Sequence, residues 1–228
     1  MASAYFDLST FRFLTALSLN NSRDWFNKHK DDYEQLVREP ALRMIRDFSP
    51  RLRRISRHFL AVDRKVGGSL MRVQRDIRFS RDKEPYKTNI GIQFRHEVGK
   101  DVHAPGFYLH LSPEDCFLAA GVWHPDPDAL GRIRQRILEQ PRSWLRAVND
   151  PSFSKLYELQ GDSLSRAPRG ISPDHPLVED LKRKDHVAVV PLSHAMATSS
   201  RLLTLLEQRF SVSRPYVRFL CQALGVPY

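Results

Sequence analysis

The stretch from Arg75 to Asn89 is the densest group of side chains that could do chemistry. Within fifteen residues it holds five cations, three carboxylates, a tyrosine and two hydroxyl side chains. Arginine offers a planar fork of donors that matches phosphate or carboxylate, and lysine adds a mobile point charge. Pro85 stiffens the turn, so donors there lose less entropy on binding than donors on a flexible loop. The stretch predicts an anion-binding site. The alternative is a solvated hairpin in which Asp82 and Glu84 neutralise the neighbouring cations.

Strand periodicity adds a second group of candidates. Polar residues alternate with apolar ones in a run from Met71 to Phe79 and in two later runs. On one face of an antiparallel sheet these polar side chains would meet: Arg72, Gln74, Asp76, Arg78, Gln93, Arg95, Tyr108 and His110. Such a surface could hold an anion while a histidine or an aspartate moves a proton. The alternative is the solvated side of a sheet, which needs no ligand.

These patterns assign two predicted roles. The candidate catalytic groups are His110 and Asp76. The candidate ligand-binding residues are Arg72, Arg75, Arg78, Arg81, Lys83, Tyr86, Lys87, Arg95 and Tyr108.

Known motifs for metals and cofactors are missing from the sequence. None of the nine histidines has the spacing of a His-Glu-x-x-His site. His103, His110 and His124 could meet across strands, but scattered histidines in a β region are more often surface or core residues. The chain also has no Gly-x-Gly-x-x-Gly loop, Walker loop or Gly-x-Ser-x-Gly elbow. We therefore expect no metal site and no cofactor.

Apolar periodicity predicts the elements that position these residues. Helical spacing dominates residues 9–58, with Ser9 and Ser22 as N-caps, Pro40 in the first turn of a third helix and Pro50 kinking or dividing it. Four alternating runs fill residues 70–124, and their connections are too short for crossover helices, which indicates an antiparallel meander.

Helical patterns return between residues 127 and 228, around a Gly-, Pro- and Ser-rich loop at 160–176 and a short strand at 186–192. We therefore predict one α+β domain over residues 1–228. It has N-terminal helices, a central antiparallel meander of about four or five strands, and C-terminal helices packed on one face.

The positive charge of the chain is concentrated in one segment. The chain has 36 Lys and Arg against 26 Asp and Glu, a net charge of +10. Residues 51–100 contain 14 of the basic and 5 of the acidic side chains, so nearly the whole excess lies there. Such a concentration creates a local potential that attracts anions. If the two halves of the segment face different ways, the clustering exists only along the chain.

The sequence also indicates in which compartment of the cell the protein is expected. No apolar run approaches the roughly 18 residues of a membrane helix, and the first residues lack the basic and apolar regions of a secretory signal. The two cysteines, Cys116 and Cys221, are too few for a disulfide framework or a zinc site. We expect a cytoplasmic protein with no membrane partner.

Several motifs resemble an uncharacterised bacterial and fungal family, domain of unknown function 2461. They are Asn20-Asn21-Ser22-Arg23-Asp24-Trp25-Phe26 followed by Tyr33, the stretch from Arg75 to Thr88, Gly106-Phe107-Tyr108-Leu109, Gly121-Val122-Trp123, and Pro168-Arg169-Gly170 followed by Asp174-His175-Pro176. The resemblance covers almost the whole chain and implies a single full-length domain of a cytosolic protein. It implies no activity, cofactor or partner.

We expect the protein to bind a phosphorylated or otherwise anionic small molecule at the basic turn and sheet, and to be an enzyme if His110 acts as an acid or base. The alternatives are a nucleic-acid-binding module, which a pI of about 9.9 favours, and a basic surface that docks an acidic protein. The sequence predicts no oligomeric state.

Overall fold

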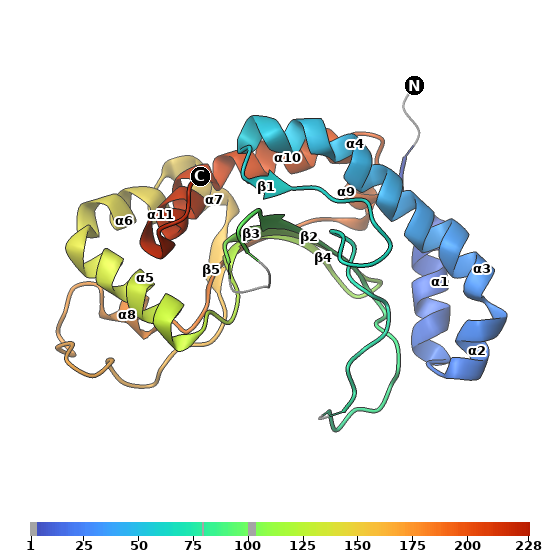
Figure 1. Cartoon of the computed structure of the whole chain (residues 1–228), viewed down its shortest axis with the longest axis horizontal. Coiled ribbons are helices and arrows are strands. Elements are labelled where there is room, and N and C mark those ends of the chain that lie inside the picture. The colour runs from blue at the N-terminus through green and yellow to red at the C-terminus, as the bar shows by residue number, and fades with distance from the viewer. Residues whose placement is uncertain (1–3, 79, 100–103) are drawn as a thin grey trace.

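A six-stranded antiparallel sheet lies at the centre of the computed structural model, which describes residues 4–78, 80–99 and 104–228 (Figure 1). The strand order is β1-β2-β3-β4-β6-β5, so the predicted meander is present as β2-β3-β4 and three further strands extend it. The strands are β1 (Phe59–Leu60), β2 (Ile90–His96), β3 (Gly106–Leu111), β4 (Cys116–Val122), β5 (Glu158–Gln160) and β6 (His186–Pro191). The predicted α+β class is confirmed.

Helices precede the sheet, interrupt it and follow it. Those before the sheet are α1 (Leu8–Leu19), α2 (Arg23–Lys28), α3 (Lys30–Tyr33), a π-helical turn η1 (Glu34–Arg38) and α4 (Glu39–Ile55). Those after β4 are α5 (Pro127–Glu139), α6 (Pro141–Val148), α7 (Pro151–Leu156), α8 (Val178–Lys182), α9 (His194–Ala197), α10 (Leu202–Val212) and α11 (Arg214–Leu224). In the described part of the chain, no helix is both long and apolar enough to span a bilayer.

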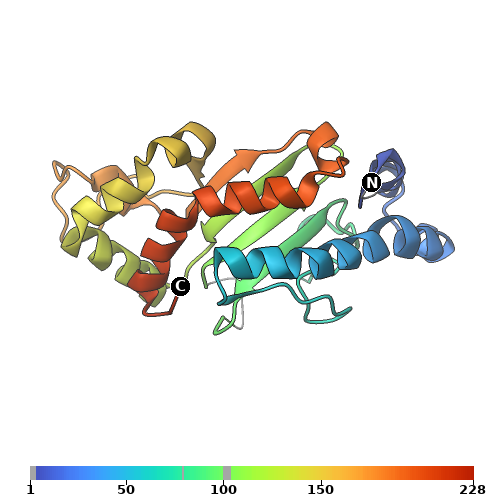
Figure 2. The ribbon, with the colours of Figure 1, turned by 90° about the horizontal axis from the view of Figure 1, so that it is seen from above.

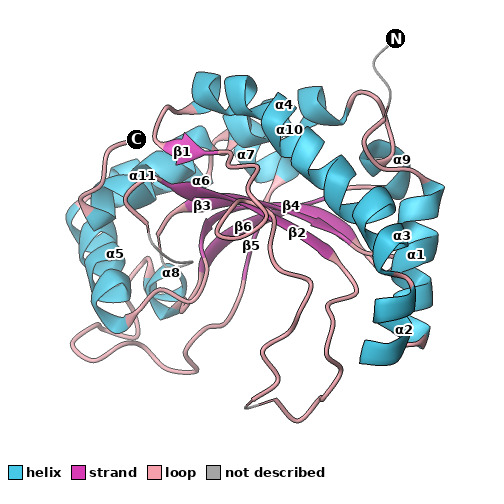
Figure 3. Ribbon diagram, turned by 45° about the vertical axis from the view of Figure 1, so that its right-hand side comes forward, coloured by secondary structure: helices cyan, strands magenta, loops and turns pink. Residues whose placement is uncertain are grey.

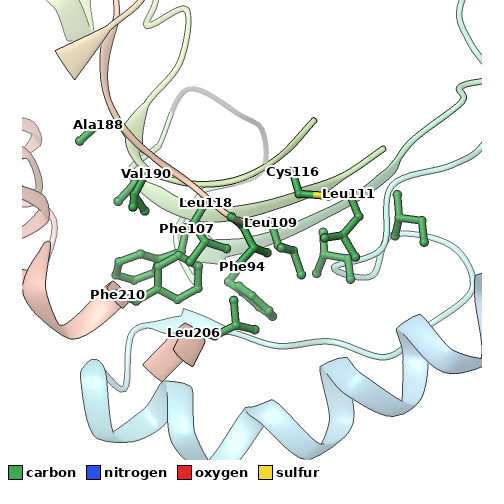
Figure 4. Packing of buried hydrophobic residues seen from close by; sticks show 14 of the residues in the cluster. Phe94, Phe107, Leu109, Leu111, Cys116, Leu118, Ala188, Val190, Leu206 and Phe210 are labelled. Carbon is green, nitrogen blue, oxygen red and sulfur yellow. The ribbon is translucent and has the colours of Figure 1, made fainter. Parts of the chain in front are cut away.

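Helices α4 and α10 run side by side across one face of the sheet (Figures 1 and 2). The strand residues beneath them are large and apolar, because alternate positions of β2, β3 and β4 point to that face. Phe210 of α10 packs against Phe107 and Phe94, with ring centroids 4.8 and 6.2 Å apart (Figure 4). Phe48 of α4 contacts Phe94 at 5.1 Å. This aromatic cluster joins the two helices to the sheet.

The opposite face of the sheet has no helix against it in the described residues (Figures 1 and 3). At the outward positions of β2, β3 and β4, Gln93, Arg95, Tyr108, His110 and Phe117 are partly exposed, whereas the neighbouring strand residues are buried, as is Ala119 on the outward face of β4. We call this surface the open face. The alternation predicted for residues 90–95 and 107–111 is confirmed, since the register pairs Gln93 with Tyr108 on the open face and Phe94 with Phe107 on the covered face.

The predicted strand from Met71 to Phe79 is wrong for the residues described, and Phe79 itself lies outside them. Residues 71–78 and 80–88 form the two described arms of a long hairpin loop, the 71–88 loop, which extends from the sheet on the side of the open face (Figure 3). Single bridges join Leu70 to Ile92 and Gln74 to Tyr86. Tyr86 of this 71–88 loop stacks on Phe26 of α2 at 4.0 Å, whereas Met71 packs beside Gly91 on the open face. The described arms of the loop pair with each other locally, at the Gln74–Tyr86 bridge, so the alternation does not mark a strand of the sheet.

Two local expectations about the N-terminal helices also differ from the structure. Asp7, not Ser9, caps α1, because its carboxylate accepts from the Ser9 and Thr10 amides. Pro50 neither divides nor ends α4, which is continuous from Glu39 to Ile55. Ser22 does cap α2, as predicted, with its hydroxyl accepting from the Trp25 amide.

Candidate functional site

A chain of polar contacts crosses the open face at His110. Its Nδ1 lies 3.2 Å from the Tyr108 hydroxyl and 3.4 Å from the Asn89 amide nitrogen. On the other side of the ring, Nε2 lies 3.3 Å from the Asp115 carboxylate. The imidazole stacks on Phe117 at 4.6 Å with an interplanar angle of 8°. Strand register creates this arrangement, because His110 pairs with Phe117 and the tight turn after β3 returns Asp115 to the histidine.

The chemistry of the partners sets the proton positions in this chain. A carboxylate only accepts, so the contact with Asp115 places the imidazole proton on Nε2 and leaves Nδ1 to accept from Tyr108 or Asn89. Burial lowers the pKa of His110, although Asp115 and Glu114 pull it upward. Burial also raises the pKa of Tyr108 to about 12. At neutral pH the pair is therefore a neutral imidazole acceptor beside a protonated phenol donor.

Gly91 of β2 gives Tyr108 room on the open face. A Cβ at this position would lie 2.7 Å from the Tyr108 hydroxyl oxygen and 3.0 Å from the Met71 sulfur. Both side chains therefore extend over the glycine, which pairs with His110 in the neighbouring strand. Because Met71 joins the 71–88 loop to the sheet edge, through its amide donating to the Gly91 carbonyl, this loop begins beside Tyr108.

Two of the predicted cations lie at or beside this surface, and a third, Arg72, is exposed at the start of the 71–88 loop. Arg95 is on the open face and donates its Nε to the Gln93 side chain at 3.1 Å, and Gln93 pairs with Tyr108. Lys87 is half-buried two residues before Asn89, and burial together with Arg72 and Arg75 lowers the pKa of its ammonium group. Burial is the larger cause, and the positive charges of Arg72 and Arg75 add a smaller repulsion that a bound anion would relieve.

Two other predicted ligand residues, Arg75 and Lys83, make their polar contacts within the 71–88 loop. Arg75 forms an ion pair with Asp82 at 2.5 Å and lies 3.7 Å from Glu84. Lys83 donates to the Ile77 carbonyl at 3.1 Å. Asp82 and Glu84 therefore neutralise Arg75, as in the solvated hairpin that the sequence left open, whereas Lys83 meets a neutral carbonyl.

Asp76, the second predicted catalytic group, is exposed in the loop and bound by Arg78. The guanidinium donates to both carboxylate oxygens, at 2.9 and 2.7 Å. These hydrogen bonds lower the pKa of Asp76 to about 2. A carboxylate with that pKa is a weak base at neutral pH. Asp76 is held by Arg78 in the loop and is not part of the arrangement around His110.

The remaining two ligand candidates differ in accessibility. Arg81 is exposed near the tip of the loop. Tyr86 is buried against Phe26, and its backbone is held by Asn21, whose side chain accepts from the Tyr86 amide at 3.1 Å and donates to its carbonyl at 3.0 Å. Its ring therefore belongs to the packing of the loop on α2.

Sequence reasoning missed four residues that complete the arrangement: Asp115, Asn89, Phe117 and Gly91. Asp115 reads as part of the turn Ser112-Pro113-Glu114-Asp115, and only the hairpin register places it beside His110. One signal could have placed Asp115 beside His110: the two residues are close in the sequence and are separated by a tight turn. The packing of Tyr108 over Gly91 has no signal in the sequence, because it depends on which strand lies alongside β3.

No group of three metal-ligating side chains occurs among the residues that the structure describes. His124 lies beyond the far end of β4 from His110, where its Nδ1 is 3.0 Å from the buried carboxylate of Asp185. His103, the third histidine considered, lies outside the described residues. Within the described chain, His110 and His124 therefore do not share a site.

Comparison with known proteins gives a family and no activity. No curated protein and no solved structure matches the chain. The model of one family matches residues 9–219, nearly the whole chain, as the motifs around Trp25 and Tyr86 predict. The chain therefore belongs to the family described as "Conserved hypothetical protein (DUF2461)".

Proposed function

We propose that the protein binds a small phosphorylated or otherwise anionic molecule on the open face and exchanges a proton with it through His110. The observation that carries this proposal is the chain Asp115–His110–Tyr108, which lies on the same face as Arg95. A neutral imidazole oriented by a carboxylate is the usual form of a general base.

The contacts define what each group would do. Tyr108 donates its hydroxyl proton, either to His110 or to an oxygen of the ligand. His110 accepts a proton at Nδ1, and Asp115 stabilises the imidazolium that results. Phe117 holds the ring in plane by stacking. The reaction class supported is proton abstraction from a bound anion, since the open face presents a base and cations together.

The cations would position the ligand. Arg95 lies on β2 two residues from Gln93, which pairs with Tyr108, and Lys87 lies in the segment before β2, two residues from Asn89, which contacts His110. Each charge-assisted hydrogen bond contributes roughly 1.5–3 kcal/mol, and solvent screening brings a half-exposed arginine toward the lower end. Two such contacts give a small ligand micromolar to millimolar affinity when combined with packing against the Tyr108 ring.

The first experiment is a melting-temperature screen of the full chain with inorganic phosphate, pyrophosphate, sugar phosphates, mononucleotides and dicarboxylates. A compound present at about 100 times its Kd adds about 2.7 kcal/mol, or roughly 5–10 °C for a chain of this size. Lys87→Gln and Arg95→Gln should each weaken a binding compound by roughly tenfold. His110→Gln should retain binding and lose any turnover of the compound.

Lys155→Gln is the matched control, because it removes one positive charge from an exposed position of α7. It should leave the affinity unchanged within about twofold, as distant surface charges are screened. Equal affinities in wild type, Lys87→Gln and Arg95→Gln would show that the ligand binds elsewhere.

The same screen tests the two alternatives. Nucleic acid contacts with several phosphates would give an affinity for single-stranded oligonucleotides that falls by about one log unit per contact for each log unit of salt. An acidic protein partner would be captured from nuclease-treated lysate by the wild type and lost with the Lys87→Gln charge change. Either result without binding of a small anion would replace the proposal.

A further inference from the structure

A second group of arginines surrounds a pocket between α6 and α11, in the part of the molecule away from the 71–88 loop (Figure 1). The pocket has a volume of about 290 Å³. Its polar lining comes from Ser143 and Arg146 of α6 and from Arg214, Arg218 and Gln222 of α11. Nothing in the proposed function uses these residues.

Helical spacing explains why the arginines converge. Arg214, Arg218 and Gln222 are four residues apart, so they lie along one face of α11. Trp144 of α6 packs against Phe219 of α11, with ring centroids 5.2 Å apart. That packing sets the neighbouring residues of α6 opposite this face of α11.

The three guanidinium groups have no acidic partner among the described residues. Arg146 makes no hydrogen bond or ion pair to another residue in that part of the chain. Arg214 contacts two neutral groups, the Arg54 carbonyl at 3.4 Å and the Tyr228 hydroxyl, and its Nε is buried with no hydrogen-bond partner in the described chain. Arg218 lies over the Tyr228 ring at 5.1 Å. By contrast, Arg51 and Arg54 of α4 both pair with Glu207.

Uncompensated arginines around one pocket repel each other and attract an anion. Guanidinium groups match the oxygens of phosphate, to which they donate two parallel hydrogen bonds. Between the arginines the wall is apolar, with Phe219, Ala147 and Pro215. A ligand that fits this lining carries a phosphate at one end and an apolar body at the other.

The volume limits the size of that ligand. Small-molecule sites usually have roughly 300–1,000 Å³, so a pocket of about 290 Å³ accommodates one phosphate and one ring. We infer that the pocket between α6 and α11 is a binding site for a small phosphate monoester with an aromatic or aliphatic body. This site is separate from the open face, and the inference does not depend on the proposed function.

Calorimetric titration of the full chain with phenyl phosphate and inorganic phosphate tests the inference. Phenyl phosphate should bind about tenfold tighter, since roughly 50 Å² of its ring would be buried on the apolar wall. Arg146→Gln and Arg218→Gln should each weaken phenyl phosphate by roughly tenfold. Both side chains are exposed, so these variants should keep the fold. Amide NMR shifts at Ser143, Ala147 and Phe219 would locate the ligand.

Two controls separate this pocket from other sources of affinity. Arg142→Gln removes an exposed charge from α6 without touching the pocket and should leave the affinity unchanged. Lys155→Gln, at an exposed position of α7 outside the pocket lining, should also leave it unchanged. The inference is overturned if wild type does not bind phenyl phosphate at about 10 mM. It is also overturned if Arg146→Gln and Arg218→Gln bind like wild type, if Arg142→Gln weakens binding equally, or if phenyl phosphate shifts the amides of Tyr108 and His110 and not those of Ser143, Ala147 and Phe219.

Discussion

Gly91 decides how Tyr108 lies beside His110, and a single added methyl group tests this. In Gly91→Ala the three atoms nearest the new Cβ would belong to the side chains of Tyr108 and Met71, which can move more easily than backbone. We therefore expect the free energy of unfolding to change by less than about 1.5 kcal/mol, while Tyr108 moves off His110 into solvent. An NMR titration should show the pKa of Tyr108 falling from about 12 toward its ordinary value of 10.0.

Gly131→Ala is the matched control for this substitution. Gly131 lies in α5, and a Cβ there meets nothing within 4 Å. It should stabilise the protein by roughly 0.5–1 kcal/mol and leave the pKa of Tyr108 unchanged. A Tyr108 pKa that stays near 12 in Gly91→Ala would contradict the role assigned to the glycine.

His186 makes the fold sensitive to acid. It is fully buried with no hydrogen-bond partner for either ring nitrogen among the described residues, and burial lowers its pKa to about 3. In the unfolded chain its pKa is about 6.5. Below about pH 6.5 the unfolded state therefore binds one more proton, and stability falls by up to about 1.4 kcal/mol per pH unit until the folded state is protonated as well.

Denaturant unfolding between pH 7 and pH 4 measures that dependence. His186→Phe keeps a ring beside Trp144, whose centroid is 5.9 Å away, and cannot take up a proton. We expect the free energy of unfolding of the variant to fall less steeply with decreasing pH than that of wild type. The difference in slope should be roughly that caused by the uptake of one proton. Parallel pH profiles for the two proteins would mean that other groups cause the acid sensitivity.

At the scale of elements, Asn21 attaches the 71–88 loop to the N-terminal helices. Its side chain bonds to both backbone groups of Tyr86, as a neighbouring strand would. Asn21→Ala leaves these two groups without partners, which should cost about 1–3 kcal/mol. Hydrogen exchange should then be faster in residues 71–88 than elsewhere.

Asn27→Ala provides the control, because Asn27 is an exposed residue of α2 outside this contact. It should change neither the unfolding free energy beyond about 0.5 kcal/mol nor exchange in the loop. If Asn21→Ala leaves the loop equally protected, stacking of Tyr86 on Phe26 suffices to hold it.

At the scale of the whole molecule, Phe210 joins the two ends of the chain through the sheet. It contacts Phe48 of α4 as well as Phe94 and Phe107 of the central strands. Phe210→Ala should lower the free energy of unfolding by about 3–5 kcal/mol, as large-to-small changes in a buried core do. The loss should appear in both halves of the chain, because they share one core.

Fluorescence of two single-tryptophan variants measures this coupling, one keeping Trp25 beside the N-terminal helices and the other keeping Trp144 in α6. Coincident denaturant curves that shift together in Phe210→Ala indicate one cooperative unit. Separate transitions, with only one of them displaced, would show that the two ends of the chain unfold independently.

Much of the fold follows from periodicity that the sequence carries locally. The alternation around Phe94 and Leu109 determines which face of each strand is buried, because a strand repeats every two residues. Ser22 predicts the start of α2, because its own hydroxyl can cap the helix. Where a local signal failed, as with Pro50 in α4, packing was stronger, since Phe48 and Leu52 on either side are fully buried and hold the helix together.

For the candidate site, the sequence by itself determined that Tyr108 and His110 share a face, because parity along a strand is a property of neighbouring residues. The register of β2 against β3 then places Arg95 on the same face. Only the tertiary structure decided that Asp115 lies beside His110 and that Asp76 forms an ion pair with Arg78. Charge composition cannot distinguish a cation paired within its own loop from one that lacks a counter-charge. That difference depends on distances between side chains, which the order of residues does not contain.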